Sequence, residues 1–240
     1  MVSSVKAVRY NTNIVTTAVW FGDSWCMGTE LEKCMGPDYK SKDQEDYRRE
    51  NRFSNLVSKH FGWKEVNLAQ EGISTEHVTL KIIEYTELQN DLQNQIYFIV
   101  WPSFQRYFWI NDSNQRQDLR WCSEYKDWYR TVDTGAYQMY CAQRTIWSTC
   151  LYLQQHKISY VMVNGQSRVT KIGPFPLQDY YWILEPGKTL GDILDVDLDQ
   201  GFPAIDQNHR YFWPAENHPN MYGHKKIAKE IINYLSDMRE

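Results

Sequence analysis

The sequence predicts an α/β fold in which helices cover both faces of a central parallel sheet. Short runs of β-branched and aromatic residues alternate with longer segments in which apolar residues recur every three or four positions. Three of the short runs end directly at Gly22, Pro102 or Asn164, as buried strands end at turns. Strands that alternate with helices are joined by crossover connections and are therefore parallel, which places functional residues at their carboxyl ends.

Four runs have the composition of buried strands. The first run, IVTTAVWF, continues straight into the turn sequence Gly22-Asp23-Ser24. The third run, IYFIVW, stops at Pro102, a residue that cannot donate a hydrogen bond within a sheet. The expected strands span residues 14–21, 63–68, 96–101 and 158–163.

Four segments have helical periodicity. In the first, Phe53, Leu56 and Val57 fall on one face, and Ser74 is a suitable N-cap for the second. The last helix has the clearest apolar stripe, with Ile227 and Ile231 one turn apart. The expected helices span 43–61, Ser74 to Ile83, 132–151 and 227–235.

The 240 residues fit one α/β domain, which we place at 1–240. Two segments lack a clear period and are rich in aromatic residues, so we interpret them as loop insertions at about 103–130 and 165–214. With 10 Trp and 17 Tyr, the chain has more aromatic residues than a minimal core needs. Those in the insertions either stack on a ligand near the strand ends or build a satellite core beneath the loops.

Composition argues against several partner classes. The net charge of −4 and the dispersed Lys and Arg residues make a nucleic-acid partner improbable. No apolar run reaches the roughly 20 residues that a membrane helix needs, so no membrane partner is expected. The N-terminus lacks the pattern of a secretory signal, and we expect a soluble protein, cytoplasmic or associated with a virion.

Neither the cysteines nor the acidic residues form a convincing metal site. The five cysteines have no zinc-ligand spacing and are interpreted as reduced thiols. The run from Asp195 to Asp206 resembles a calcium loop, but Gln200 stands where the turn needs Gly. We interpret the run as a solvated acidic loop, and no metal is expected.

The segment FGDSWCMGTEL, residues 21–31, carries the first candidate for chemistry. A buried strand delivers Ser24 onto a tight turn, which exposes a hydroxyl and directs backbone N–H groups to the same point. Gly-Asp-Ser alone is also ordinary turn chemistry. Cys26 lies two residues further on and is an alternative nucleophile, although a small buried apolar side chain is the simpler interpretation.

The segment ENHPNMYGHKKIA, residues 216–228, carries the second candidate. A nucleophilic serine needs a base within hydrogen-bond reach, and the base needs an acceptor that holds its tautomer. His218 supplies the base and Glu216 the acceptor. A helix-capping or buried histidine is the alternative for His218 when this segment is considered alone.

Together these segments resemble the SGNH (GDSL-like) hydrolases. The sequence has G-D-S followed by G-T-E, then NLAQEGIS at residues 67–74, then H-P-N-x-x-G-H, in the order found in that family. The resemblance implies a three-layer α/β/α sandwich of the flavodoxin-like type, ester hydrolysis through an acyl-enzyme, and no cofactor. It assigns Ser24 as nucleophile and oxyanion-hole donor, Gly72 as a further backbone donor and His218 as general base, with His224 structural.

The chain departs from the family pattern in two places. The family usually has an oxyanion-hole Asn after the third strand, but this chain reads WPSFQR, so Ser103 or Gln105 would have to donate instead. This version of the block resembles SGNH-type proteins encoded by tailed phages. The triad acid commonly lies three residues before the histidine, where this chain has Ala215; Glu216, or a backbone carbonyl, would take its place.

The sequence thus predicts a serine esterase that removes an O-acyl, most simply O-acetyl, group from a carbohydrate or polysaccharide. The alternative is a catalytically weak or inactive SGNH-shaped module that binds a glycan or serves a structural role in a virion, and assembly into an oligomer or virion stays open. A lysophospholipase or thioesterase is a third interpretation.

Overall fold

The computed structural model contains a four-stranded parallel sheet of order β2-β1-β3-β6. The strands are β1 (Thr17–Phe21), β2 (Lys64–Asn67), β3 (Gln95–Trp101) and β6 (Ser159–Asn164). The register places Trp20 opposite Asn67 on one side and Phe98 on the other. The structure describes residues 15–35, 41–104, 106–110, 116–119, 135–169, 175–177, 180, 182–184, 187–196, 211 and 218–238.

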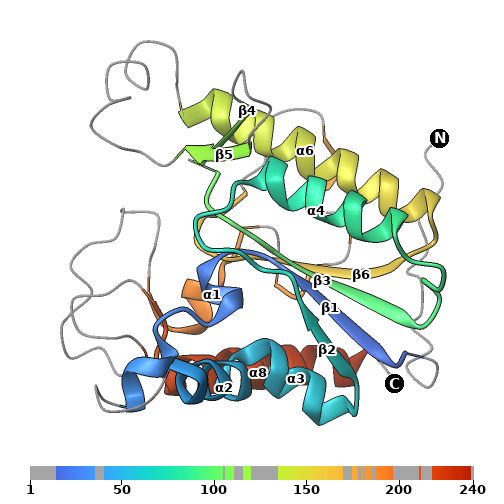
Figure 1. Ribbon diagram of the computed structural model, residues 1–240. Helices are drawn as coiled ribbons and strands as arrows, with labels where there is room; N and C mark the ends of the chain where they lie inside the picture. The colour runs from blue at the N-terminus through green and yellow to red at the C-terminus, as the bar shows by residue number, and fades with distance from the viewer. Residues whose placement is uncertain are drawn as a thin grey trace.

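Helices cover both faces of this sheet (Figure 1), which confirms the predicted α/β architecture. One face carries α2 (Ser41–Asn51), α3 (Phe53–Phe61) and α8 (Met221–Asp237). The other carries α4 (Thr75–Glu87) and α6 (Gly135–Gln155).

Alternating side chains of the buried strands divide between two cores. Trp20 and Phe98 stack at a ring-centroid distance of 4.0 Å on the side of α3 and α8. Phe21 and Tyr97 pack on the opposite side, beneath α4 and α6, with their centroids 5.2 Å apart. The period of two along each strand thus supplies both faces of the sheet.

The predicted helix over 43–61 is wrong in one respect, because the chain forms two helices there rather than one. Arg52 has φ −69° and ψ 146°, an extended conformation that ends α2 and begins α3. In this conformation the Arg52 guanidinium donates to both carboxylate oxygens of Glu65 on β2, at 3.0 and 2.8 Å. A two-fold charge-assisted contact outweighs the continuation of a regular helix here.

Both predicted loop insertions contain regular structure. Within 103–130 the chain forms an antiparallel pair, β4 (Tyr107–Ile110) and β5 (Arg116–Leu119). Within 165–214 it forms the short helix α7 (Leu190–Ile193), which Thr189 and Asp192 close with a reciprocal capping box.

The strand order places a topological switch point between β1 and β3. The chain adds β2 on one side of β1 and then crosses to the other side to add β3. The connections from β1 and β3 therefore diverge at their carboxyl ends, where ligands of open α/β sheets bind. The short helix α1 (Ser24–Met27) and the 3₁₀ helix η1 (Leu31–Met35) follow β1 at this end (Figure 1).

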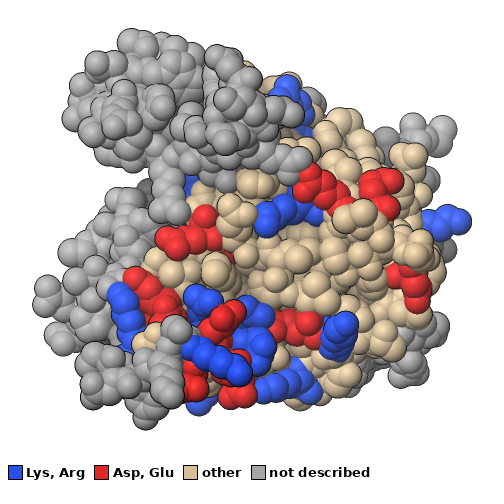
Figure 2. Space-filling view, in the orientation of Figure 1, with Lys and Arg blue, Asp and Glu red and all other residues tan. Residues whose placement is uncertain are grey.

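Charges of both signs are interspersed on the face shown in Figure 2, where acidic and basic side chains alternate over the lower part of the molecule. The sequence of α2, SKDQEDYRREN, and its Arg49 to Asp46 ion pair reflect this mixture. Of the helices that the structure describes, none combines the length and apolar character needed to cross a lipid bilayer.

Candidate active site

Ser24 is the first residue of α1, directly after β1 and the turn Gly22-Asp23. The Asp23 side chain caps this turn, since its Oδ1 accepts the Trp25 N–H at 3.1 Å. Gly22 is required for close packing, because a Cβ there would lie 2.9 Å from Cβ of both Cys26 and Val100. Ser24 itself is 2% exposed, so its hydroxyl lies in a largely dry setting.

The chain after α1 folds back over Ser24. Gly28 has φ +79°, and the N–H groups of Gly28 and Thr29 each donate to the Ser24 carbonyl at 3.0 Å. Glu30 also has a positive φ, +73°, which is uncommon for a residue with a side chain and often marks a functional position. These two left-handed residues turn the loop sharply and fix the direction in which the Glu30 side chain leaves it.

The Glu30 carboxylate contacts His218. Glu30 Oε2 lies 2.9 Å from His218 Nδ1, and Glu30 Oε1 accepts from Lys33 Nζ at 3.0 Å. Both side chains of the Glu30–His218 pair are about four-fifths buried, at 19% and 20% exposed. His218 immediately precedes α8, whose first turn is capped by the Asn220 side chain. A carboxylate from the nucleophile loop thus holds the histidine that the sequence predicts as the base.

Gly72 lies in a second turn that is joined to the first. After β2, the N–H of Gln70 donates to the Gly22 carbonyl at 2.9 Å, which ties the turn of Gly72 to the turn of Ser24. Gly72 has φ +71°, a conformation that favours glycine over any L-residue. The structure therefore brings together the two segments that supply Ser24 and Gly72.

The remaining predicted site residues have different outcomes. Ser103 Oγ accepts a hydrogen bond from Ser167 Oγ at 3.0 Å, so at least one lone pair of this hydroxyl is engaged outside the two turns. Gln105 and Glu216 lie outside the described residues. Sequence reasoning missed Glu30: its only local signal was the G-T-E that follows the serine block, and nothing in that motif points to a histidine near the other end of the chain.

Sequence reasoning also gave no role to Arg106, which follows β3 in the block that lacks the usual Asn. Its Nη1 donates to Asp23 Oδ2 at 3.2 Å and to the Ile73 carbonyl at 3.3 Å. Its Nη2 donates to Gln166 Oε1 at 3.1 Å. Arg106 therefore contacts residues adjacent to both Ser24 and Gly72.

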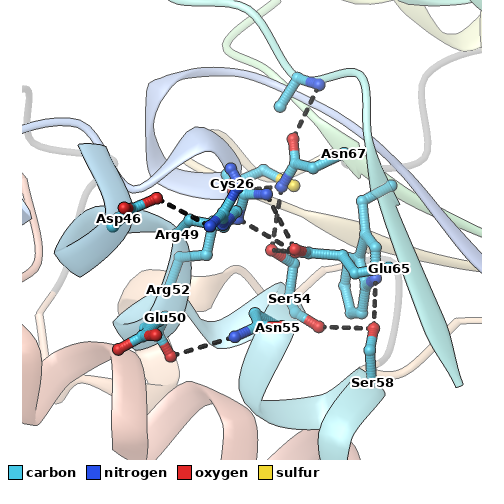
Figure 3. Close-up of polar contacts among 12 residues, drawn as sticks. Cys26, Asp46, Arg49, Glu50, Arg52, Ser54, Asn55, Ser58, Glu65 and Asn67 are labelled. Atoms are coloured by element: carbon cyan, nitrogen blue, oxygen red, sulfur yellow. Dashed lines mark hydrogen bonds and ion pairs between the residues drawn. The ribbon is translucent and has the colours of Figure 1, made fainter. Parts of the chain in front are cut away.

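A polar network supports the far end of α1 (Figure 3). Asn67 Nδ2 donates to the Cys26 carbonyl at 3.0 Å and to Ser54 Oγ at 2.9 Å, and Ser54 in turn donates to Glu65. Glu65 also receives the two contacts from Arg52. The network therefore connects β2, α3 and the carboxyl end of α1, and it fixes the backbone two residues beyond Ser24.

Cys26 has the properties of a core residue rather than a nucleophile. Its side chain is buried, and this burial raises the pKa of the Cys26 thiol well above its ordinary value of 9.0. A neutral thiol is a poor nucleophile. This environment argues against Cys26 as the nucleophile.

His224, the second histidine of the C-terminal block, is an internal anchor. Its Nδ1 accepts the Phe53 N–H at 3.2 Å, and its ring stacks on that of Phe53 at 5.4 Å. Burial, and to a lesser degree the charges of His218 and Arg52, lowers the pKa of His224 to about 3. A neutral imidazole therefore joins α8 to the start of α3.

Described aromatic residues of the second insertion pack inward. Phe175 contacts Tyr140 and Trp147 of α6 at 5.4 and 5.5 Å, and Trp182 is buried, with its Nε1 donating to the Leu177 carbonyl at 2.8 Å. These rings form a satellite core. Phe104 also packs against this core, and Tyr107, Phe108 and Trp109 belong to β4. The aromatic residues of 121–129 lie outside the described residues.

Of the acidic run that resembles a calcium loop, Asp195 is described and pairs with Lys226 at 2.7 Å. Asp197, Asp199 and Asp206 lie outside the described residues. Within the part of the chain that the structure describes, no three His, Cys, Asp or Glu side chains are grouped as metal ligands would be.

Comparison with known proteins identifies structural rather than sequence relatives. No family model and no curated protein sequence matches the chain. The crystal structure of TesA matches with a TM-score of 0.53 at 10% identity, over 93% of this chain and 99% of that one. A member of the lipolytic protein G-D-S-L family from Veillonella parvula matches with a TM-score of 0.48 at 12% identity, over 91% and 97% of the two chains.

A third match is a carbohydrate esterase described as having divergent catalytic and non-catalytic binding functions in its active site. Its TM-score is 0.49 at 14% identity, over 92% of this chain and 68% of that one. The similarity to TesA spans nearly the whole of both chains and shows a shared fold. The chain therefore has the three-layer α/β/α fold that its resemblance to the SGNH hydrolases predicts.

Proposed function

We propose that this protein is a serine esterase that hydrolyses its substrate through an acyl-enzyme on Ser24. The observation that carries the proposal is the 2.9 Å contact between Glu30 and His218. Glu30 belongs to the loop that folds over the Ser24 carbonyl, so this contact brings a carboxylate-bound imidazole to the nucleophile turn. Serine, histidine and a carboxylate on the histidine's second nitrogen are the components of a hydrolytic triad.

The proposed reaction proceeds in two steps. His218 Nε2 takes the Ser24 proton as Oγ attacks the ester carbonyl, and the imidazolium then protonates the leaving alcohol as the C–O bond breaks. In the second step His218 takes a proton from water, whose oxygen attacks the acyl carbon. The acyl–Oγ bond then breaks, the imidazolium returns its proton to Ser24 Oγ, and the acid leaves. Glu30 holds the proton on Nδ1 throughout, and the N–H groups of Ser24 and Gly72 stabilise the oxyanion.

For the substrate we propose an O-acyl, most simply O-acetyl, ester on a carbohydrate. The sequence supports this proposal through the aromatic residues that are concentrated in the segments after the strands, since flat rings can stack on sugar faces. Phe175 and Trp182 are not available for this role, because they pack inward. A second candidate function is a module of the same fold that binds a glycan without turnover. The 2% exposure of Ser24 favours this candidate.

Hydrolysis of p-nitrophenyl acetate and labelling by a small fluorophosphonate test the proposal together. We expect the wild type to turn over the ester and to incorporate one label at Ser24, and the Ser24→Ala variant to lose both. Ser148→Ala, which removes a hydroxyl on the outer surface of α6, is the matched control and should retain both. A wild type that is inert towards both reagents, but binds glycans, would establish the second candidate. Release of acetate from an acetylated polysaccharide tests the proposed substrate class.

A further inference from the structure

We propose that Arg106 is a positioning residue that holds the two oxyanion-binding turns in register, in place of the Asn that the family carries after its third strand. This inference rests on the proposed function, since it assigns a role within the same site. It does not require Arg106 to touch the substrate. The guanidinium acts through the residues next to Ser24 and Gly72.

The contacts of Arg106 join all four strand ends of the main sheet. Arg106 itself follows β3, and its three acceptors follow the other strands: Asp23 after β1, Ile73 after β2 and Gln166 after β6. The planar, always charged guanidinium can serve several acceptors in fixed directions, which an ammonium cannot do. A single side chain thus connects four segments that belong to separate loops of the backbone.

The side chains that make these contacts are largely buried. Asp23 is fully buried and Gln166 is 6% exposed, while the Arg106 side chain is 17% exposed. A carboxylate without access to water needs a charged partner. Loss of the ion pair between Asp23 Oδ2 and Arg106 would leave a buried charge uncompensated, so this contact is strongly favoured. The other Asp23 oxygen, Oδ1, caps the Trp25 N–H. Arg106 therefore fixes the side-chain conformation that shapes the turn of Ser24.

The second half of the oxyanion site is held in the same way. Ile73 directly follows Gly72, and its carbonyl accepts from the same Nη1 that binds Asp23. One nitrogen therefore sets the separation between the Asp23-Ser24 turn and the Gly72-Ile73 turn. Small displacements of groups that stabilise a transition state cost large factors in rate, about 10²-fold for 1 Å.

The test compares Arg106→Lys and Arg106→Gln with Arg168→Gln. Arg168 is the matched control because, like Arg106, it follows a strand of the main sheet, in its case β6, and forms an ion pair, 2.8 Å to Asp192 at the start of α7. Arg106→Lys keeps a positive charge beside buried Asp23 and is the variant expected to stay folded. For each protein we would measure kcat and KM for p-nitrophenyl acetate, the affinity for a small boronic acid that forms a tetrahedral adduct on serine, and hydrogen exchange of peptides covering 22–28 and 68–75.

We expect both Arg106 variants to lose about 10- to 100-fold in kcat, with KM changed less than threefold and boronic acid affinity reduced in parallel with kcat. Exchange should rise in both peptides, whereas Arg168→Gln should match the wild type within twofold. A folded Arg106→Lys protein with wild-type kcat and exchange would overturn the inference. If the wild type hydrolyses no ester, the proposed function fails, but the exchange measurement still decides whether Arg106 holds the two turns.

Discussion

Glu30 Oε2 lies 2.9 Å from His218 Nδ1, although the two residues are 188 positions apart in the chain. This carboxylate comes from the loop that follows the proposed nucleophile, whereas Glu216, the acid that the motif suggests, lies outside the described residues. The other Glu30 oxygen binds Lys33, which leaves Oε2 directed at the imidazole. This arrangement supplies the orienting group from the serine block, a position at which the sequence motif gave no indication of the role.

We predict that Glu30→Gln lowers kcat by about 10²- to 10⁴-fold, because an amide no longer stabilises the imidazolium and can hold the wrong tautomer. Steady-state hydrolysis of p-nitrophenyl acetate measures the effect. Glu216→Gln is the informative comparison, because Glu216 is the acid that the sequence motif suggests. If Glu216→Gln causes the large loss and Glu30→Gln does not, Glu216 orients His218 and the assignment of Glu30 is wrong.

A double-mutant cycle separates this role from a general structural one. His218→Ala removes the group through which Glu30 is proposed to act, so adding Glu30→Gln to it should cost less than about threefold. Equal losses in the two backgrounds would mean that Glu30 affects activity by another route.

Gly72→Ala should reduce both stability and activity. A left-handed conformation costs an L-residue about 1–2 kcal/mol, and relief of this strain would rotate the peptide whose N–H we propose as an oxyanion donor. Gly62→Ala is a close control, since Gly62 has φ +72° and a Cβ there would meet nothing within 4 Å. We expect similar losses of unfolding free energy in urea for the two variants, but a fall in kcat for Gly72→Ala alone. If kcat falls in both variants, backbone strain rather than a lost oxyanion donor explains the effect of Gly72→Ala.

Arg52→Met should lower the unfolding free energy by about 3 kcal/mol, because it leaves Glu65 buried without its cation. The side chains of Arg52 and Glu65 are 14% and 8% exposed. Arg49→Met removes a comparable contact to Asp46 between side chains that are 60% and 44% exposed, and should cost less than about 1 kcal/mol. Urea unfolding measures both. Equal costs would show that the network beneath α1 contributes no more than a surface ion pair.

His224 should make the fold sensitive to acid. The folded protein takes up the His224 proton only near pH 3, because burial lowers that pKa, whereas the unfolded chain takes it up near pH 6.5. The stabilising contribution is therefore complete above pH 6.5 and is lost progressively as the pH falls towards 3. Between pH 7 and 4.5 the wild type should lose about 2–3 kcal/mol more than His224→Gln. His60→Gln, at an exposed position on α3, should follow the wild type.

The order of the main strands and helices could be predicted from the sequence because buried segments have an apolar pattern that is recognisable locally. Residues 18–21 and 96–101 are apolar at every position, as strands covered on both faces must be. No such pattern marks the break between α2 and α3 at Arg52, since the apolar periodicity of 53–61 is compatible with one longer helix. The cause is an ion pair with Glu65, on a strand that folds against it.

The residues of the candidate site also differ in whether a local sequence pattern marks them. Ser24, Gly72 and His218 belong to motifs that are recognisable within a few residues, and the structure joins the first two through the Gln70 to Gly22 hydrogen bond. Glu30 and Arg106 could not be predicted, because their roles depend on distant partners. Tertiary contacts of single polar side chains leave no periodicity in the sequence.

The length of the loop that the Glu30–His218 contact closes has a consequence for how activity is acquired. Contacts between residues so far apart are entropically costly to form and are made after local structure. The parallel sheet can assemble around β1 and β3 while the imidazole is still distant from the serine. In a refolding experiment, far-ultraviolet circular dichroism should recover first, and ester turnover should appear only when α8 docks through His224 against Phe53. The recovery of ester turnover would then measure the docking of α8, a late step of folding, rather than the formation of the sheet.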